Sequence, residues 1–221
     1  MPNAVLMPDA RVRVPAVALY ERGLATRRLW ARDAHGTRFR LPVADWSAVT
    51  IPGDAELVSR CIGPTLDIGC GPGRLVAALT TSGIDALGID ISAGAVARAR
   101  KLGANALRRC VFGPVPRAGS WNFALLADGN IGIGGDPARL LRRVRGLLAP
   151  GGRALVEVAP PGVASAAREL QLEDEFGAVS DPFPWAEVGA GGIHQFARAS
   201  RLVVTERWNC SGRWFVELRR V

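Results

Sequence analysis

Short apolar runs alternate with amphipathic segments through the middle of this 221-residue chain. Apolar runs of this kind are typical of strands buried on both faces of a sheet, whereas apolar residues at three- and four-residue spacing indicate helices. The alternation predicts an α/β fold with a mostly parallel, doubly wound sheet covered by helices on both faces. We expect strands at 65–70, 86–91, 107–112, 121–127 and 153–158, and helices at 55–62, 73–81, 93–102 and 137–148.

The C-terminal end of the chain follows a different pattern. Apolar and polar residues alternate at 202–208 and again at 213–219. The segment Asn209-Cys210-Ser211-Gly212 between them is rich in turn residues, so we expect an antiparallel hairpin.

The N-terminal end is harder to interpret. Met1–Val14 shows no clear period, and we expect an irregular tail there. His35-Gly36 can turn a small hairpin with arms at Trp30–Arg32 and Arg38–Leu41. We therefore divide the chain into an N-terminal extension at 1–52 and a main domain at 53–221.

The net charge of +8 raises the question of a nucleic-acid partner. Lys101 is the only lysine among 28 basic residues, and the arginines are dispersed along the chain. A nucleic-acid surface needs such residues on one continuous face with stacking aromatics. An ordinary basic surface explains the charge more simply, so a nucleic-acid partner is disfavoured but stays open. Four arginines are expected on a solvated helix face: Arg139, Arg142, Arg143 and Arg145.

Composition also bounds the location of the protein. No apolar run reaches the length of about 18 residues that a membrane-spanning helix needs, so no membrane partner is expected. Met1–Val14 lacks the apolar core of a signal peptide. The four cysteines show neither metal-ligand spacing nor a C-x-x-C pair, so we expect reduced thiols, no metal and a cytoplasmic location.

One segment carries the chemistry: Leu66-Asp67-Ile68-Gly69-Cys70-Gly71-Pro72-Gly73-Arg74-Leu75. Its glycines let a strand turn sharply into a helix and let a ligand approach bare backbone at the helix N-terminus. Asp90, which ends the next apolar run, can accept hydrogen bonds from both hydroxyls of a ribose. The segment does not fit the dinucleotide fingerprint G-x-G-x-x-G, because Arg74 and Val76 stand where the last glycine would be.

The motif D-x-G-x-G-x-G, with Asp90 after the next strand, resembles that of class I S-adenosylmethionine-dependent methyltransferases. Residues 147–156, which contain Pro150-Gly151-Gly152, resemble the turn from the last helix into the fifth strand of the same family. The resemblance covers about Gly63 to Val158. It implies a Rossmann-like, mostly parallel seven-stranded sheet with an antiparallel C-terminal hairpin, and S-adenosyl-L-methionine as cofactor.

The resemblance also implies roles for the residues at the strand ends. Asp67 would orient the ammonium group of the cofactor, Asp90 would hold the ribose hydroxyls, and Ile91 and Phe112 would enclose the adenine, although Phe112 could equally be a core residue. The family often has an acidic or polar side chain after the third strand, and Cys110-Val111-Phe112-Gly113 lacks an acid, which leaves the adenine contacts open. The full set of expected cofactor-binding residues is Asp67, Gly69, Cys70, Gly71, Gly73, Asp90, Ile91, Val111, Phe112, Ala127 and Asp128.

Two residues are candidates for direct catalysis. Asp128 follows the fourth strand, where the family places the transferred methyl group, and could accept a proton or only position a loop. His194 carries an imidazole, the side chain used most often in general acid–base catalysis, and could act as a base or be structural. The segment at Asp128 is not [N/D]-P-P-[F/Y], which disfavours exocyclic amines of DNA bases and glutamine amides as acceptors. The glycine-rich stretch Gly129–Gly135 is either an active-site loop or a connector.

The sequence thus favours methyl transfer to an oxygen or nitrogen of a small molecule. Two alternatives stay open: a methyltransferase acting on RNA or protein, and a methyltransferase-like nucleotide-binding module without catalysis. In this family an N-terminal extension often forms part of the substrate lid, but a packed extension without substrate contact is equally compatible with residues 1–52. The sequence predicts no particular oligomeric state.

Overall fold

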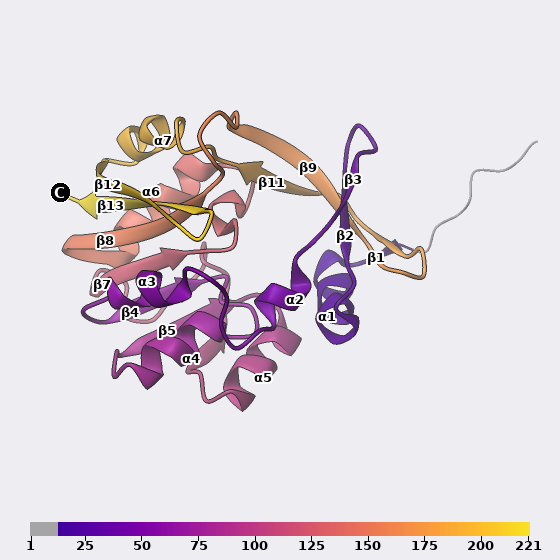
Figure 1. Cartoon of the computed structure of the whole chain (residues 1–221), viewed down its shortest axis with the longest axis horizontal. Helices are drawn as coiled ribbons and strands as arrows, with labels where there is room; N and C mark the ends of the chain where they lie inside the picture. The colour runs from indigo at the N-terminus through magenta and orange to yellow at the C-terminus, as the bar shows by residue number, and fades with distance from the viewer. Residues whose placement is uncertain (1–12) are drawn as a thin grey trace, which may run out of the picture.

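The computed structural model describes residues 13–221, which form two sheets (Figure 1). The main sheet has seven strands in the order β12-β13-β8-β7-β4-β5-β6. Strands β6, β5, β4, β7 and β8 are parallel to their neighbours in that run, whereas β13 is antiparallel to both β8 and β12. The strands are β4 (Thr65–Ile68), β5 (Ala86–Asp90), β6 (Ala106–Arg108), β7 (Trp121–Leu126), β8 (Leu148–Val158), β12 (Leu202–Cys210) and β13 (Arg213–Arg220). The predicted α/β class is confirmed.

Helices cover both faces of the main sheet. One apolar cluster joins α3 (Asp54–Ser59), α4 (Arg74–Thr81) and α5 (Ala93–Lys101) to one face. A second cluster joins α6 (Pro137–Leu147) and α7 (Ile193–Ala199) to the other. Adjacent residues of β7 belong to different clusters: Ala124 faces α6, and Leu125 faces α4. The strands are continuously apolar because each face is buried.

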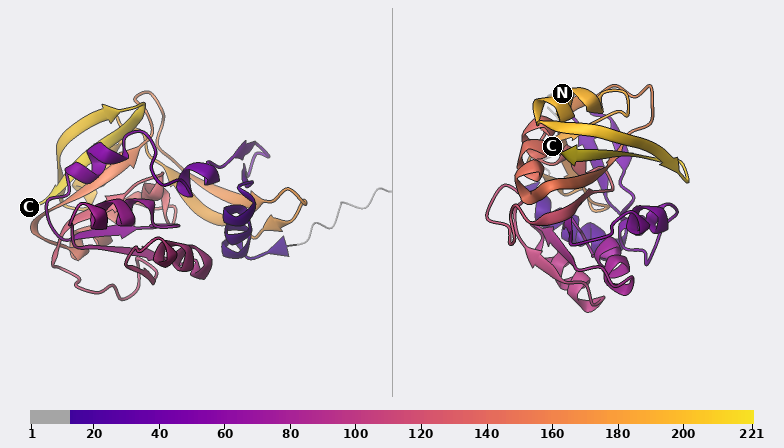
Figure 2. Two further views of the ribbon diagram at one scale, coloured as in Figure 1. Left: turned by 60° about the horizontal axis from the view of Figure 1, so that its bottom comes forward. Right: turned by 90° about the vertical axis from the view of Figure 1, so that its left-hand side faces the viewer.

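The N-terminal extension contributes to a second sheet, which projects from the main body (Figure 2). The predicted hairpin is present as β2 and β3, and β2 continues the sheet onto β9 with Trp30 opposite Glu173. An apolar core beneath it joins Leu19 of α1 to Leu170 and Leu172 of β9. The elements are β1 (Arg13–Val14), α1 (Ala16–Thr26), β2 (Trp30–Asp33), β3 (Arg38–Arg40), α2 (Val43–Trp46), β9 (Ala166–Glu173), β10 (Val179–Ser180) and β11 (Phe183–Glu187).

The structure bears on the predicted irregular tail and on the predicted boundary at residue 52. Arg13–Val14 is not part of an irregular tail, because it pairs in parallel with Val179–Ser180; the rest of the predicted tail lies outside the described residues. The predicted boundary at residue 52 does not separate the two sheets, since β9, β10 and β11 follow it in sequence and still pair with each other or with β2. The second sheet is therefore built from both sides of that boundary.

The predicted third strand is too long. It ends at Arg108 rather than at residue 112, because the amide of Arg109 makes a last bond to the carbonyl of Asp90 and the chain then turns at residues 110–113. Arg143 holds this turn by donating to the carbonyls of Val111 (2.7 Å) and Gly113 (2.6 Å).

The expectation of four solvated arginines on one helix holds for Arg139 and Arg142, which are exposed. The guanidinium of Arg139 also lies 4.4 Å from the centre of the Phe112 ring. Arg143 and Arg145 are half-buried, since Arg143 holds the turn after β6 and Arg145 donates to the carbonyl of Arg201. Periodicity placed all four on the polar side of α6, but neighbouring segments cover two of them.

No helix within residues 13–221 is both long enough and apolar enough to cross a membrane.

Candidate active site

The glycine loop, Gly69–Gly73, connects β4 to α4 at the carboxyl edge of the main sheet. Gly69, Gly71 and Gly73 all have positive φ, which favours glycine. At Gly73 a Cβ would also lie 2.6 Å from the Cβ of Ala99, so this glycine allows α4 to approach α5 closely. At Gly69 a Cβ would lie 2.7 Å from the side-chain nitrogen of Asn130. Two of the three glycines therefore make room for the protein's own side chains.

Asp90 closes the loop from the neighbouring strand. Its Oδ2 accepts a hydrogen bond from the amide of Gly71 (3.0 Å) and its Oδ1 accepts one from the amide of Ser92 (2.8 Å). Burial raises the pKa of Asp90, although these amides act in the opposite direction. Two fixed amides leave the carboxylate with outward lone pairs in a defined orientation, which is the arrangement a ribose diol requires.

Asp67 is a buried carboxylate that lacks a partner. Its residue is 3% exposed, and within residues 13–221 it makes no hydrogen bond or ion pair. Burial, followed by the charge of Asp128, raises the pKa of Asp67 to about 7. A cation that contacts a buried, unpaired carboxyl stabilises its charged form.

The side chain of Cys70 points away from the ligand surface. It belongs to the core on the α4 side of the sheet, and its Sγ lies 2.6 Å from the position a Cβ would take at Gly88. Burial raises the pKa of this thiol. Only the backbone of Cys70 is available to a cofactor.

Tyr20 and Glu21 of α1 were not predicted, yet both reach the glycine loop region. The hydroxyl of Tyr20 lies 3.1 Å from the position a Cβ would take at Gly71. Burial and then the charge of Asp90 raise the pKa of Tyr20, which keeps its hydroxyl protonated and able to donate. The carboxylate of Glu21 accepts hydrogen bonds from the hydroxyl of Ser92 and the amide of Gly94, both at 2.8 Å. The N-terminal extension thus contacts the predicted cofactor surface.

The residues predicted to contact adenine have different environments. The side chain of Ile91 is 53% exposed at the end of β5, although it is apolar. Val111 is buried in the core on the α6 side, so only its backbone can reach a ligand. Phe112 packs against Gly134 as well as Arg139, as a partly buried residue of the same core.

Five charged side chains converge beneath the loop, and we call them the ion-pair cluster: Asp54, Arg74, Asp128, Glu157 and Arg213. They come from α3, α4, the end of β7, β8 and β13. Arg74 pairs with Asp54 and with Asp128, the latter at 2.6 Å. Arg213 pairs with Asp54 (2.9 Å), Asp128 (3.3 Å) and Glu157 (2.8 Å). The side chains of Asp54 and Arg74 are each 3% exposed.

The cluster fixes the backbone after β7. Asp128 has a left-handed conformation with φ of 53°, and its amide donates to Oε2 of Glu157 at 2.6 Å. Ala127 before it is buried. Asn130 after it donates to the carbonyls of Ile68 and Gly69, at 3.0 and 2.9 Å. Because both carboxylate oxygens of Asp128 are bound by arginines, this geometry favours the loop-positioning role over that of a proton acceptor.

His194 lies apart from these groups. It is exposed at the start of α7, and its Nδ1 lies 2.8 Å from the carbonyl oxygen of Gly191. Among the described residues, no hydrogen bond or ion pair joins it to Asp67, Asp90 or Asp128. Its predicted role as a base therefore gains no support from this geometry.

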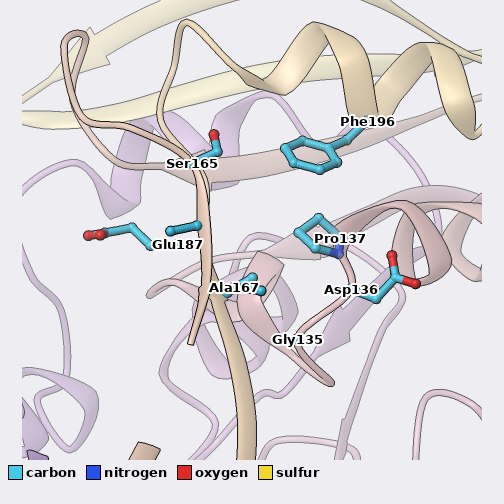
Figure 3. Close-up of a pocket in the computed structure, with 9 residues that line it drawn as sticks. Gly135, Asp136, Pro137, Ser165, Ala167, Glu187 and Phe196 are labelled. Carbon is cyan, nitrogen blue, oxygen red and sulfur yellow. The ribbon is translucent and has the colours of Figure 1, made fainter. Parts of the chain in front are cut away.

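A cavity of about 200 Å³ lies between the second sheet, the start of α6 and Phe196 of α7 (Figure 3). Its polar groups are already engaged, since Asp136 accepts from the amide of Arg139 and Ser165 accepts from the amide of Gly189. A volume of this size falls below the roughly 300 Å³ at which ligand pockets begin.

The glycine-rich stretch after β7 is tightly packed against β11. A Cβ at Gly132 would lie 2.2 Å from the carbonyl oxygen of Ala186, and one at Gly135 would lie 2.7 Å from the Cβ of Pro184. These glycines allow the second sheet to approach the end of β7.

Comparison with known proteins identifies the family. Residues 54–198 match a family model described as a methyltransferase domain, and the chain belongs to that family. No curated protein was found to match the sequence of this chain.

Solved structures share the fold. One is an S-adenosylmethionine-dependent methyltransferase from Bacteroides fragilis in complex with S-adenosylhomocysteine, with a TM-score of 0.76 and 19% identity over 96% of this chain and 99% of that one. Another is the 1,6-didemethyltoxoflavin-N1-methyltransferase of Burkholderia thailandensis, with a TM-score of 0.59 and 17% identity over 96% of this chain and 93% of that one. The protein is a class I S-adenosylmethionine-dependent methyltransferase, so the predicted family, enzyme class and cofactor are confirmed.

Proposed function

We propose that the protein binds S-adenosylmethionine in a cleft over the glycine loop and transfers its methyl group to a nitrogen or oxygen of a small molecule. The observation that carries the placement of the cofactor is Asp67, a buried carboxylate without a partner. The ammonium group of the methionine part would supply the missing cation. Asp90 would bind the ribose hydroxyls, and the exposed side chain of Ile91 would be covered by the adenine.

The remaining predicted contacts fit this placement through backbone or through packing. The amide of Gly71 donates to Asp90, and the hydroxyl of Tyr20 lies close to Gly71. The phenol of Tyr20 would therefore touch the cofactor. The backbone of Cys70 and Val111 would contribute, since both side chains are buried. Phe112 would border the adenine from the side held by Arg139.

Methyl transfer from a sulfonium is an in-line displacement with a good leaving group. Positioning and exclusion of water can supply much of its rate. Asp128 and Asn130 would act by holding the loop after β7 at a fixed place relative to the glycine loop. A protein base is needed only for an acceptor that ionises poorly. His194 stays a candidate for that role if α7 approaches the acceptor.

A small acceptor is favoured by the second sheet. Its core includes Ala95 of α5, next to the predicted ribose site, so the chain covers this side of the cleft with its own residues. Arginines of this sheet are paired with acids, such as Arg28 with Glu175 (2.8 Å) and Arg32 with Glu173 (2.8 Å), which leaves less free positive charge for RNA. We infer that the second sheet is the substrate lid.

All four cysteines are free, which supports the predicted cytoplasmic location.

The test incubates the purified protein with S-adenosylmethionine and a panel of small amines, nitrogen heterocycles and phenols, and measures release of S-adenosylhomocysteine. Transfer RNA and a protein extract serve as macromolecular acceptors, and the Asp90→Ala variant as a background. Turnover with a small acceptor supports the proposal. Turnover with RNA or protein alone would assign the other acceptor class, and cofactor binding without any turnover would favour the non-catalytic module.

A further inference from the structure

The ion-pair cluster does not balance its charges. Three carboxylates, Asp54, Asp128 and Glu157, are paired with only two guanidiniums, Arg74 and Arg213. Burial would raise the pKa of Asp54, but hydrogen bonds from Arg74 and the amide of Ile51 lower it overall, so this carboxyl is ionised. Burial raises the pKa of Asp128, whereas Arg74 and Arg213 favour its charged form. With all five groups ionised the cluster carries a net charge of −1.

This excess charge lies next to the predicted cofactor site. Arg74 directly follows Gly73 of the glycine loop, and Asp67 pairs in register with Leu125, three residues before Asp128. Burial and then Asp128 raise the pKa of Asp67, and Arg74 opposes them. Burial, Asp90 and Cys70 raise the pKa of Tyr20, Asp128 adds to them, and the exposed Arg98 of α5 opposes them. Asp128 is thus the member of the cluster whose charge reaches both Asp67 and Tyr20.

The methyl donor and its product differ in charge. S-adenosylmethionine carries a sulfonium, an ammonium and a carboxylate, with a net charge of +1. In the transfer the S–CH3 bond breaks, its electron pair stays on the sulfur, and a lone pair of the acceptor forms the new bond to the methyl carbon. The remaining thioether, S-adenosylhomocysteine, has no net charge. A buried negative potential therefore distinguishes the two, because Coulomb interactions are strong where water is excluded.

We propose that the unbalanced charge of the ion-pair cluster makes the cleft bind the cationic methyl donor in preference to its neutral product. The inference rests on the placement of the cofactor proposed above. Its consequence is weak product inhibition, since S-adenosylhomocysteine loses an attraction at the moment it forms. Asp128 is the specificity-determining residue in this scheme because it is the most exposed carboxylate of the cluster, at 23% of its side chain, and its charge reaches both Asp67 and Tyr20.

The test is calorimetric titration of the wild type and of Asp128→Asn with three ligands: S-adenosylmethionine, sinefungin and S-adenosylhomocysteine. Sinefungin has an amine-bearing carbon in place of the methylated sulfur and is therefore a cation without the sulfonium. The substitution keeps the shape of the side chain and makes the cluster neutral. We expect about fivefold weaker binding of the two cations, the order of magnitude for one unit charge acting through a partly screened site. Binding of S-adenosylhomocysteine should change by less than about twofold.

Glu217→Gln is the matched control. Glu217 is also a buried, paired carboxylate of β13, but it is bound by Arg153 and Thr205, outside the ion-pair cluster. Its loss removes the same charge and should leave the ratio of the three affinities unchanged. Glu157→Gln is a second variant within the cluster, for which we expect the same selective loss as in Asp128→Asn.

Equal changes in all three affinities in both cluster variants would overturn the inference and leave the proposed function intact. Unchanged affinities for all three ligands in both cluster variants would overturn it as well. A wild-type protein that binds none of the three ligands would overturn the proposed function itself, and the inference with it.

Discussion

The carboxylate of Glu21 accepts a hydrogen bond from the amide of Gly94 at 2.8 Å, across 73 residues of sequence. Gly94 lies in the first turn of α5, where free amides and the helix dipole favour an anion. This contact attaches the N-terminal helix α1, and with it Tyr20, to the start of α5, four residues after Asp90.

Replacement of Glu21 by glutamine should loosen α1. The neutral amide keeps an acceptor oxygen but loses the charge that favours the helix N-terminus. We expect faster amide hydrogen exchange in α1 and about threefold weaker binding of S-adenosylhomocysteine, for a contact of roughly 0.3–1 kcal/mol. Glu175→Gln, which removes the same charge from the far end of the second sheet, is the control. Unchanged exchange in α1 would show that Glu21 does not hold the helix.

Asp67 should make the ligand-free protein less stable as pH rises. The pKa of Asp67 is raised to about 7 in the folded protein, mainly by burial, whereas the unfolded value is about 3.9. The folded state therefore holds the extra proton between these values. Its contribution to stability is fully present below about pH 4 and is lost as pH rises through 7, by at most about 4 kcal/mol.

The Asp67→Asn variant tests whether Asp67 causes this loss of stability as pH rises. Urea unfolding of the ligand-free variant should give a higher free energy of unfolding than the wild type at pH 8, with the difference shrinking toward pH 5. The same variant should bind S-adenosylmethionine more weakly, since it no longer offers a carboxylate to the ammonium group. Asp85→Asn, at the exposed opposite end of β5, should follow the wild type. A variant that keeps the wild-type dependence on pH would refute the assignment to Asp67.

Alanine substitutions at Gly73 and Gly83 distinguish the cost of backbone strain from the cost of close packing. Both have positive φ, but a Cβ at Gly73 meets Ala99 at 2.6 Å, whereas nothing lies within 4 Å of one at Gly83. Gly83→Ala should cost about 1 kcal/mol of stability from strain alone. Gly73→Ala should cost about 3 kcal/mol, because overpacking adds to the strain. Denaturant unfolding measures both, and equal costs would show that α4 and α5 can move apart freely.

The glycine loop and Asp90 could be predicted because their signals are local. The spacing of Gly69, Gly71 and Gly73 lies within five residues, and a strand that ends in an acid needs no distant information. The helices around them were placed to within a few residues for the same reason. Even here, the packing of Ala99 against Gly73 became visible only in the structure.

The second sheet could not be predicted from local patterns. Trp30 pairs with Glu173, more than 140 residues away, and Ala166–Glu173 has the alanine, leucine and glutamate content that favours helices. Its strand conformation is imposed by pairing with β2 and β11. Tertiary pairing overrides local propensity in such segments.

The ion-pair cluster was missed for a related reason. Each member was visible, but Arg74 was interpreted only as a departure from a fingerprint. Glu157 and Arg213 lie where the fifth strand ends and the last strand begins. Charged residues at those ends were a usable signal, because the predicted reversal of the last strand brings the two ends together.

The central claim is that the cleft above Gly71 holds S-adenosylmethionine through Asp90. The most direct test is calorimetric titration of wild type, Asp90→Ala and Asp85→Ala with S-adenosylhomocysteine and with NAD. We predict micromolar binding of S-adenosylhomocysteine alone, weakened at least about tenfold (about 1.4 kcal/mol) in Asp90→Ala and unchanged in Asp85→Ala. Binding that is equally strong in Asp90→Ala, or a wild type that binds NAD instead, would contradict the account.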